Sequence, residues 1–170
     1  TPTRRSFLTQ LGFAGFATPF ITRGLLAQSP NSTLRHASIG AGGRAVDDIR
    51  NMTANSFVTL VAVADVDFDK TAAISKQRPE VKVYQDWREL LDKEAKNIDS
   101  VNVSTPDHMH APIAMSAMQL GKHVYVQKPL AHDLFEVRQL TTFAHKKKLV
   151  TQMGIQIHSS AVYREAVRII

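Results

Sequence analysis

The sequence predicts an α/β fold, a doubly wound parallel sheet with helices on both of its faces. Short apolar runs alternate with segments one helix long, and two runs, at 101–103 and 124–126, end abruptly in polar loops that contain proline. This alternation predicts right-handed crossovers between parallel strands. Strands are expected at 35–39, 59–64, 81–84, 100–103, 123–126 and 149–153, and helices at about 44–53, 68–77, 86–95, 109–120 and 133–148.

Local signals support several of these helix boundaries. Asp86 precedes the helix that begins near Trp87, and its carboxylate can accept hydrogen bonds from the first free N–H groups. Pro112 falls in a first turn, and Gly121 follows a last turn. Capping and alternation therefore predict the same elements.

The first expected strand leads directly into a glycine-rich turn, Gly40-Ala41-Gly42-Gly43-Arg44-Ala45. In a dinucleotide-binding turn the first glycine permits the tight bend and the second lets the backbone approach a pyrophosphate, while a small third residue lets helix and strand pack. The N-terminus of the next helix would face the phosphates, because its free N–H groups and its dipole favour anions. The turn predicts a Rossmann domain that binds a dinucleotide.

Asp65 ends the second expected strand, about 20 residues beyond the glycines. An acidic residue at this place accepts hydrogen bonds from the adenosine ribose hydroxyls and repels a 2′-phosphate, so NAD is favoured over NADP. One alternative stays open. The sheet could be flavodoxin-like with an incidental glycine turn, and Asp65 could then serve only to cap the helix after Asp67.

Composition excludes several classes of protein. The net charge is +6 over 170 residues, but residues 1–27 carry three arginines and no acid, so the remainder is only weakly basic. This balance argues against a nucleic-acid surface, and the lysine run at 146–148 fits the end of a helix. Because the chain has no cysteine, disulfides, cysteine metal sites and thiol nucleophiles are excluded.

The N-terminal segment predicts an export signal. Residues 3–8, Thr-Arg-Arg-Ser-Phe-Leu, resemble the twin-arginine motif, and a modestly apolar stretch follows to residue 21. This stretch is too short and too interrupted by glycine and proline for a stable transmembrane helix. We expect a signal peptide at 1–27, a linker at 28–33, recognition by the twin-arginine translocase and a periplasmic protein. A disordered or amphipathic leader is the alternative.

Together, several motifs resemble those of the glucose-fructose oxidoreductase / inositol dehydrogenase / MocA (Gfo/Idh/MocA) family. They are the glycine turn with Asp65, the Thr-Pro-Asp-His-Met-His loop at 105–110, the Gly-Lys-His-Val-Tyr-Val-Gln-Lys-Pro-Leu segment at 121–130, and Gln-Met-Gly at 152–154. The resemblance implies an NAD(P)-binding domain at 34–155 and only the start of a second, substrate-binding domain at 156–170. It also implies that the full-length protein is a homo-oligomer.

The resemblance also implies roles for individual residues. Lys128 matches the lysine that lies near the nicotinamide and the substrate hydroxyl, and it is the expected catalytic residue. The peptide bond between Lys128 and Pro129 is a candidate for the cis form. A salt-bridged lysine at the end of a strand is the alternative for Lys128. The family commonly has Glu before this lysine, whereas this chain has Gln127. The expected cofactor-binding residues are Gly40, Gly42, Gly43, Arg44, Asp65, Thr105, His110, Gln127 and Lys128.

The remaining histidines are weaker candidates. His108 and His110 lie two residues apart at the junction of a loop and a helix, with no third ligand nearby in the sequence, so no metal site is expected. His36, His132 and His145 are expected at the surface or at the flanks of strands. Asp107 fits an N-cap as well as a functional role.

The resemblance implies an oxidoreductase that transfers hydride between NAD and a secondary alcohol of a sugar, cyclitol or sugar acid. The substrate would be a small carbohydrate, and the catalytic base would lie in the second domain. Two alternatives stay open. One is a glycosidase that uses NAD for transient oxidation at C3, and the other is a nucleotide-binding fragment without catalytic activity.

Overall fold

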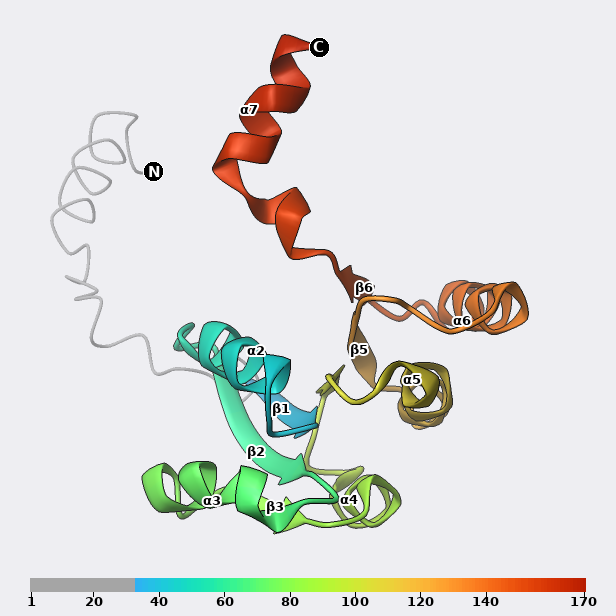
Figure 1. Cartoon of the computed structure of the whole chain (residues 1–170). Helices are drawn as coiled ribbons and strands as arrows, with labels where there is room; N and C mark the ends of the chain where they lie inside the picture. Colours follow the sequence, from blue (N-terminus) through green and yellow to red (C-terminus); the bar gives the residue numbers. More distant parts are fainter. Residues whose placement is uncertain (1–32) are drawn as a thin grey trace, which may run out of the picture. The chain divides into compact units, whose positions relative to one another are not determined.

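The computed structural model describes residues 33–170, so the predicted signal peptide and most of the linker lie outside the described residues. Its sheet has six parallel strands in the order β3-β2-β1-β4-β5-β6 (Figure 1). The strand order reverses between β1 and β4, where ligands bind in open α/β sheets. The strands are β1 (Leu34–Ile39), β2 (Val58–Ala64), β3 (Lys82–Tyr84), β4 (Ser100–Val103), β5 (His123–Gln127) and β6 (Thr151–Gly154).

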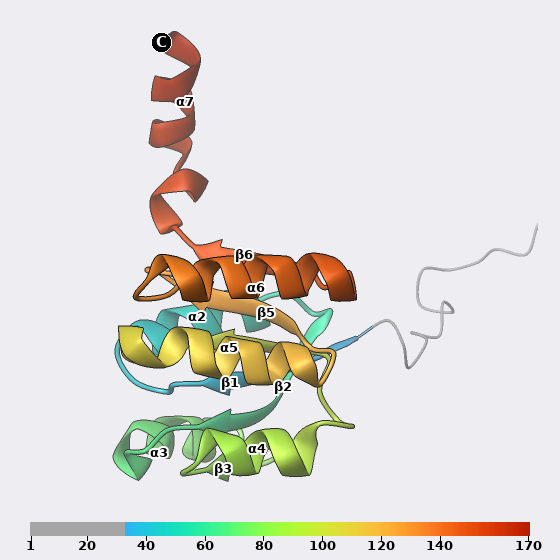
Figure 2. The ribbon, with the colours of Figure 1, turned by 90° about the vertical axis from the view of Figure 1, so that its right-hand side faces the viewer.

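Helices cover both faces of this sheet, which confirms the predicted doubly wound fold. Figure 2 shows α4, α5 and α6 in front of the sheet, with α2 and α3 behind it. The helices are α2 (Arg44–Thr53), α3 (Phe68–Gln77), α4 (Trp87–Glu94), α5 (His110–Gln119), α6 (Leu134–Lys147) and α7 (Ala161–Ile169), with 3-10 turns η2 (Asp107–Met109) and η3 (Gln156–Ser159). None of the helices in residues 33–170 has the length and apolar character needed to cross a membrane.

The observed caps explain why most predicted boundaries are correct. Asp86 accepts a hydrogen bond from the Arg88 N–H at 2.8 Å and starts α4, and Gly121 follows α5 with a φ of 75°. The last strand begins two residues later than predicted. Lys148, in the left-handed conformation, and Leu149, whose N–H donates to the Ala144 carbonyl, still belong to the C-terminal cap of α6.

The core lies on both sides of the sheet. One cluster packs β1, β4 and β5 against α4, α5 and α6, and a smaller one, which includes Ile49, Leu60 and Val81, lies near α2 and α3. Every residue of β4 is buried, as expected for a central strand covered on both faces. The site is built on the ends of these strands, and the packed core keeps them rigid.

One buried carboxylate fastens the edge strand β3 to α4. Glu94 accepts hydrogen bonds from Lys82 Nζ at 2.8 Å, Tyr84 Oη at 2.6 Å and Asn97 Nδ2 at 3.0 Å. Burial acts to raise the pKa of the Glu94 carboxyl, but these donors outweigh it and lower that pKa to about 2. Burial and the hydrogen bond to Glu94 together raise the pKa of Tyr84 to about 12.

Candidate functional site

A cleft of about 1010 Å³ opens beyond the carboxyl ends of β1, β2 and β4. This is the place where the strand order reverses, and its size is that of a site for a cofactor or small molecule. Its walls combine the glycine turn, the end of β2, the N-terminus of α4 and the loop after β4. The residues that line it include Gly40, Gly43, Asp65, Lys70, Arg88 and Thr105.

The glycine turn has a steric reason for its first glycine. Gly40 has a φ of +103°, and a Cβ there would lie 2.4 Å from the backbone oxygen of Ser104 at the end of β4. Gly43 precedes α2 with a φ of +53°, and a Cβ there would meet nothing within 4 Å. No side chain caps α2, but the Ala45 and Val46 N–H groups donate to the carbonyls of Gly42 and Gly43, so the N–H groups left for the cleft are those that precede Ala45. The predicted phosphate turn is therefore a backbone cradle at a helix N-terminus.

Gly42 differs from the other two glycines. Its φ lies outside the positive range, and a Cβ there would meet the side-chain carbons of Lys70 at 3.0 and 3.1 Å. The nearest neighbour of Gly42 is therefore a flexible side chain, and the absence of a Cβ leaves room for the stem of Lys70 in the cleft.

Asp65 stands at the end of β2 and lines the cleft as the sequence predicts. Its Oδ2 accepts a hydrogen bond from the Ala41 N–H at 2.7 Å, and its Oδ1 accepts one from the Asp67 N–H at 3.0 Å. The carboxylate thus ties the glycine turn to the neighbouring strand. Each of its oxygens keeps a further lone pair, so it can still accept a ribose hydroxyl. The helix after it, α3, is capped by Asp67, whose carboxylate accepts from the Asp69 N–H at 3.0 Å.

Sequence analysis missed three residues on the wall formed by α3 and α4. Lys70, Trp87 and Arg88 line the cleft, and the Arg88 guanidinium lies 4.6 Å from the centre of the Trp87 ring. This arrangement is a cation–π contact, and the same guanidinium lies 3.3 Å from Asp86 Oδ1. The cleft is lined by both cations and carboxylates, so the local charge does not decide between NAD and NADP; the charged residues are Arg44, Lys70, Arg88, Asp65, Asp67, Asp86 and Glu89.

The loop after β4 brings Thr105 and His108 to the cleft, but it places His110 elsewhere. The Thr105 hydroxyl is buried and has no hydrogen-bond partner among the described residues. His110 is 1% exposed, with Nδ1 2.5 Å from the Pro129 carbonyl oxygen and Nε2 2.9 Å from that of Thr105. Its ring therefore joins the loop after β4 to the loop after β5. Both ring nitrogens are used in this link, so His110 supports the site and does not present a free nitrogen to the cleft.

Lys128 follows the end of β5 and is exposed. No salt bridge within residues 33–170 involves its ammonium group. The peptide bond to Pro129 is cis, the form for which the sequence makes it a candidate. The side chain is thus available to a bound molecule, whereas the preceding residue, Gln127, is 4% exposed and points into the protein.

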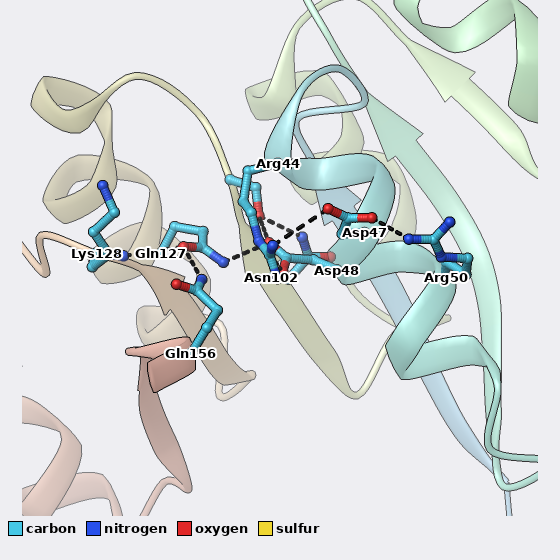
Figure 3. Close-up of polar contacts among 9 residues, drawn as sticks. Arg44, Asp47, Asp48, Arg50, Asn102, Gln127, Lys128 and Gln156 are labelled. Atoms are coloured by element: carbon cyan, nitrogen blue, oxygen red, sulfur yellow. Dashed lines mark hydrogen bonds and ion pairs between the residues drawn. The ribbon is translucent and has the colours of Figure 1, made fainter. Parts of the chain in front are cut away.

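Gln127 takes part in a buried polar network that the sequence did not reveal (Figure 3). Its Nε2 donates to Asp48 Oδ2 at 2.8 Å, and its Oε1 accepts from Gln156 Nε2 at 2.8 Å. Ser104 donates to the same Asp48 oxygen at 2.7 Å, and Arg44 Nε lies 3.2 Å from Asp48 Oδ1. Arg44, predicted to bind the cofactor, therefore lines the cleft while its guanidinium contacts Asp48.

The network continues from Ser104 through Asn102 on β4 to His36 on β1. Its Nε2 lies 2.9 Å from Asn102 Oδ1, and its Nδ1 lies 2.7 Å from Ser100 Oγ. His36 is 3% exposed and lies within β1, so the expectation of a residue at the surface or at the flank of a strand is wrong. The reason is the strand order, which sets β1 in the middle of the sheet. Burial lowers the pKa of His36 to about 4, although the hydrogen bond to Asn102 acts in the opposite direction.

His132 lies apart from this site, on the loop before α6. Within residues 33–170, His132, Asp133 and Glu136 have ligand atoms within 4.8 Å of one another. His132 and Asp133 are exposed, and Glu136 also accepts from the His132 backbone N–H. Such a group is common at helix N-termini without an ion, since Asp133 is the N-cap of α6.

Comparison with known proteins agrees with this geometry. Residues 34–155 match the model of the Gfo/Idh/MocA oxidoreductase family, described as an NAD-binding Rossmann fold. The chain is 33% identical over 122 residues to an alpha-N-acetylgalactosaminidase of Shewanella oneidensis, covering 66% of this chain and 26% of that protein. It is 29% identical over 125 residues to inositol 2-dehydrogenase of Salmonella paratyphi B, covering 72% of this chain and 37% of that protein.

The solved structures show the same fold. The crystal structure of myo-inositol 2-dehydrogenase from Lactobacillus plantarum superposes with a TM-score of 0.73 at 26% identity, over 81% of this chain and 40% of that one. The chain therefore spans between about a quarter and two fifths of the length of these proteins. Since the family model covers residues 34–155 and the cleft is built from the same residues, the chain belongs to the Gfo/Idh/MocA oxidoreductase family with an NAD-binding Rossmann fold.

Proposed function

We propose that the chain is the cofactor-binding part of an NAD-dependent dehydrogenase that oxidises a secondary alcohol of a sugar, cyclitol or sugar acid. The observation that carries the proposal is the glycine cradle at the switch point of the sheet, beside Asp65, in a chain of this oxidoreductase family. The similarity to an inositol 2-dehydrogenase supports the substrate class.

The residues in the cleft fit a dinucleotide. The backbone at Gly43 is open, the first turn of α2 has no side-chain cap, and the buried Thr105 hydroxyl lacks a partner among the described residues. The cradle would hold the pyrophosphate, and Asp65 would accept the adenosine ribose hydroxyls, which favours NAD. When bound, the nicotinamide supplies the acceptor or donor of hydride.

Lys128 is the proposed catalytic residue. It is exposed directly after β5, and His110 links the following residue, Pro129, to the cleft-lining loop after β4. An ammonium group there would donate a hydrogen bond to the substrate hydroxyl and stabilise the alkoxide that develops as hydride leaves.

A glycosidase is the second candidate, and specific relatives favour it. The 33% identical Shewanella oneidensis protein is an alpha-N-acetylgalactosaminidase, and several further relatives are glycosyl hydrolase family 109 proteins. In this reading, oxidation at C3 permits elimination and addition of water, and reduction then restores the cofactor. We favour the dehydrogenase because the Gln127-Lys128-Pro129 segment keeps the lysine and proline of the oxidoreductase motif. Net release of NADH with inositols would support it, and hydrolysis of N-acetylgalactosaminides without net NADH would support the glycosidase.

The cellular setting is part of the proposal. The twin-arginine motif at residues 3–8 supports export in the folded state, through the twin-arginine translocase, to the periplasm. A protein exported by this route would carry its cofactor with it. A small carbohydrate is the proposed substrate partner, and the longer protein would be a homo-oligomer.

The first test is a fluorescence titration of the 170-residue chain with NADH and with NADPH. We expect NADH to bind more tightly than NADPH, and Asp65→Asn to weaken NADH while reducing the preference. Asp92→Asn, an exposed carboxylate on α4 outside the cleft, is the matched control. Failure of a folded chain to bind either dinucleotide would contradict the proposal.

A further inference from the structure

Asp48 is a buried carboxylate whose partners come from three different elements. It lies on α2 and is 3% exposed. Ser104 after β4 and Gln127 on β5 both donate to its Oδ2, at 2.7 and 2.8 Å, while Arg44 Nε contacts its Oδ1 at 3.2 Å (Figure 3). A buried ionised carboxylate is tolerated only when donors surround it, and these three supply what it needs.

The donor role of Ser104 follows from the groups behind it. Asn102 Nδ2 donates to Ser104 Oγ at 3.0 Å, and Asn102 Oδ1 accepts from His36 Nε2 at 2.9 Å. Each group therefore accepts from one side and donates to the other, so the hydroxyl hydrogen of Ser104 is directed at Asp48. All partners of Asp48 are donors, and the carboxylate needs no proton to satisfy them.

The orientation of the Gln127 amide is set from both ends. Its nitrogen faces Asp48, and its oxygen accepts from Gln156 Nε2 and lies 3.4 Å from the Lys128 backbone N–H. A glutamate at 127 can only accept, so it would place a second carboxylate against the buried Asp48. Two carboxylates in contact cannot both stay ionised, and one of them must take up a proton. The contact with Asp48 therefore gives a physical reason why this chain has Gln at position 127, where members of the family commonly have Glu.

We infer that Asp48 is a positioning residue of this site, which requires a neutral amide at 127 and holds the end of β5 against the helix that carries the glycine turn. Asp48 does not itself line the cleft, and it acts through Gln127, which directly precedes Lys128, and through Arg44 and Ser104, which line the cleft. The expected effect on NADH binding rests on the proposed function. The contact between Asp48 and Gln127 is a property of the fold and does not depend on that function.

The test compares Gln127→Glu, Asp48→Asn and the double variant Asp48→Asn/Gln127→Glu with the unaltered chain. The double variant restores one carboxylate and one amide with their places exchanged. Gln139→Glu, on the exposed side of α6, is the control for adding a negative charge. Each protein is studied by thermal unfolding and by NADH titration, at about pH 8 and at about pH 5.5.

Within residues 33–170, few charged or titratable groups face Asp48 and residue 127. Arg44 on α2 contacts Asp48, and Tyr125 on β5 has a pKa that is raised by burial and by Asp48. The contact from η3 is Gln156, which does not titrate. Because its pKa is raised, Tyr125 stays neutral at both pH values. His36, which reaches Asp48 through Asn102 and Ser104, is present in every variant, so its effect is removed by comparison with the unaltered chain. A pH-dependent difference between Gln127→Glu and the unaltered chain therefore reports protonation of the two carboxylates.

For Gln127→Glu we expect a Tm lower by roughly 5 °C or more at about pH 8, with most of the loss recovered at about pH 5.5. NADH affinity should fall by about tenfold at the higher pH and recover in parallel, because one tenfold step corresponds to about 1.4 kcal/mol. The double variant should regain both Tm and affinity at about pH 8. If Gln127→Glu does not fold at about pH 8, folding restored by Asp48→Asn gives the same support.

Three results would overturn the inference. They are a Gln127→Glu protein indistinguishable from Gln139→Glu, a loss that does not depend on pH, and a double variant no better than Gln127→Glu. Absence of NADH binding by the unaltered folded chain would instead contradict the proposed function, while the unfolding data would still decide whether Asp48 and Gln127 are paired.

Discussion

Replacing the first glycine of the turn should damage the fold more than replacing either of the other two. In Gly40→Ala, the φ of +103° is strained for an L-residue, at about 1–3 kcal/mol. The new Cβ would also lie 2.4 Å from the Ser104 backbone oxygen, and relief of that contact needs a backbone shift that costs about 1–3 kcal/mol. We therefore expect a loss of about 2–6 kcal/mol in the free energy of unfolding.

The neighbouring glycines separate the two contributions. Gly43→Ala keeps the backbone strain at a φ of +53° but meets no atom within 4 Å, so it should cost about 1–3 kcal/mol. Gly42→Ala meets only the flexible stem of Lys70 and should change stability by less than about 1 kcal/mol. Urea unfolding monitored by the single tryptophan measures all three. Equal losses for Gly40→Ala and Gly42→Ala would refute the steric reasoning.

Two further predictions concern acid stability. The folded pKa of His36, about 4, lies below its unfolded value of 6.5, so the unfolded chain binds the proton first, and up to about 3 kcal/mol of stability should be lost as pH falls from 6.5 to 4. His36→Gln should flatten this slope in urea unfolding, and an unchanged slope would contradict the assignment. The folded pKa of Glu94 is depressed to about 2, so its contribution, about 1–3 kcal/mol, should persist above pH 4.5 and disappear toward pH 2. Glu94→Gln should remove it, whereas Glu80→Gln, an exposed control, should not.

Sequence reasoning succeeded wherever the determinant was local. The strand and helix boundaries follow from hydrophobic runs and caps such as Asp86 and Gly121, each of which acts within a few residues. Asp65 was predicted at the end of the second strand from its distance to the glycines along the chain, and the structure places it there, bonded to the Ala41 N–H. The Lys128-Pro129 bond was considered as a cis candidate because proline alone makes that form accessible.

The residues that sequence reasoning missed depend on the order of the strands in the sheet. His36 is buried because β1 pairs with β4, which brings it to Ser100 and Asn102, more than 60 residues away in the sequence. Asp48 and Gln127 are 79 residues apart, and a carboxylate within a helix that also contains Asp47 gives no signal of burial. A periodicity analysis of α2 that placed Asp48 on the same face as Ala45 and Ile49 could have found it.

The same contacts join the two ends of the candidate site into one structural unit. Gly40 packs against the Ser104 backbone, the Ser104 side chain donates to Asp48, and Asp48 holds Gln127 beside Lys128. The glycine turn, which would hold the phosphates, and the lysine, which would act on the substrate, are therefore positioned by α2 together with the ends of β4 and β5. Because these connections are buried and short, the distance between the cofactor cradle and Lys128 is set by the fold of this domain alone. In the proposed enzyme, a second domain would then need only to bring the substrate to a site whose cofactor side is already organised.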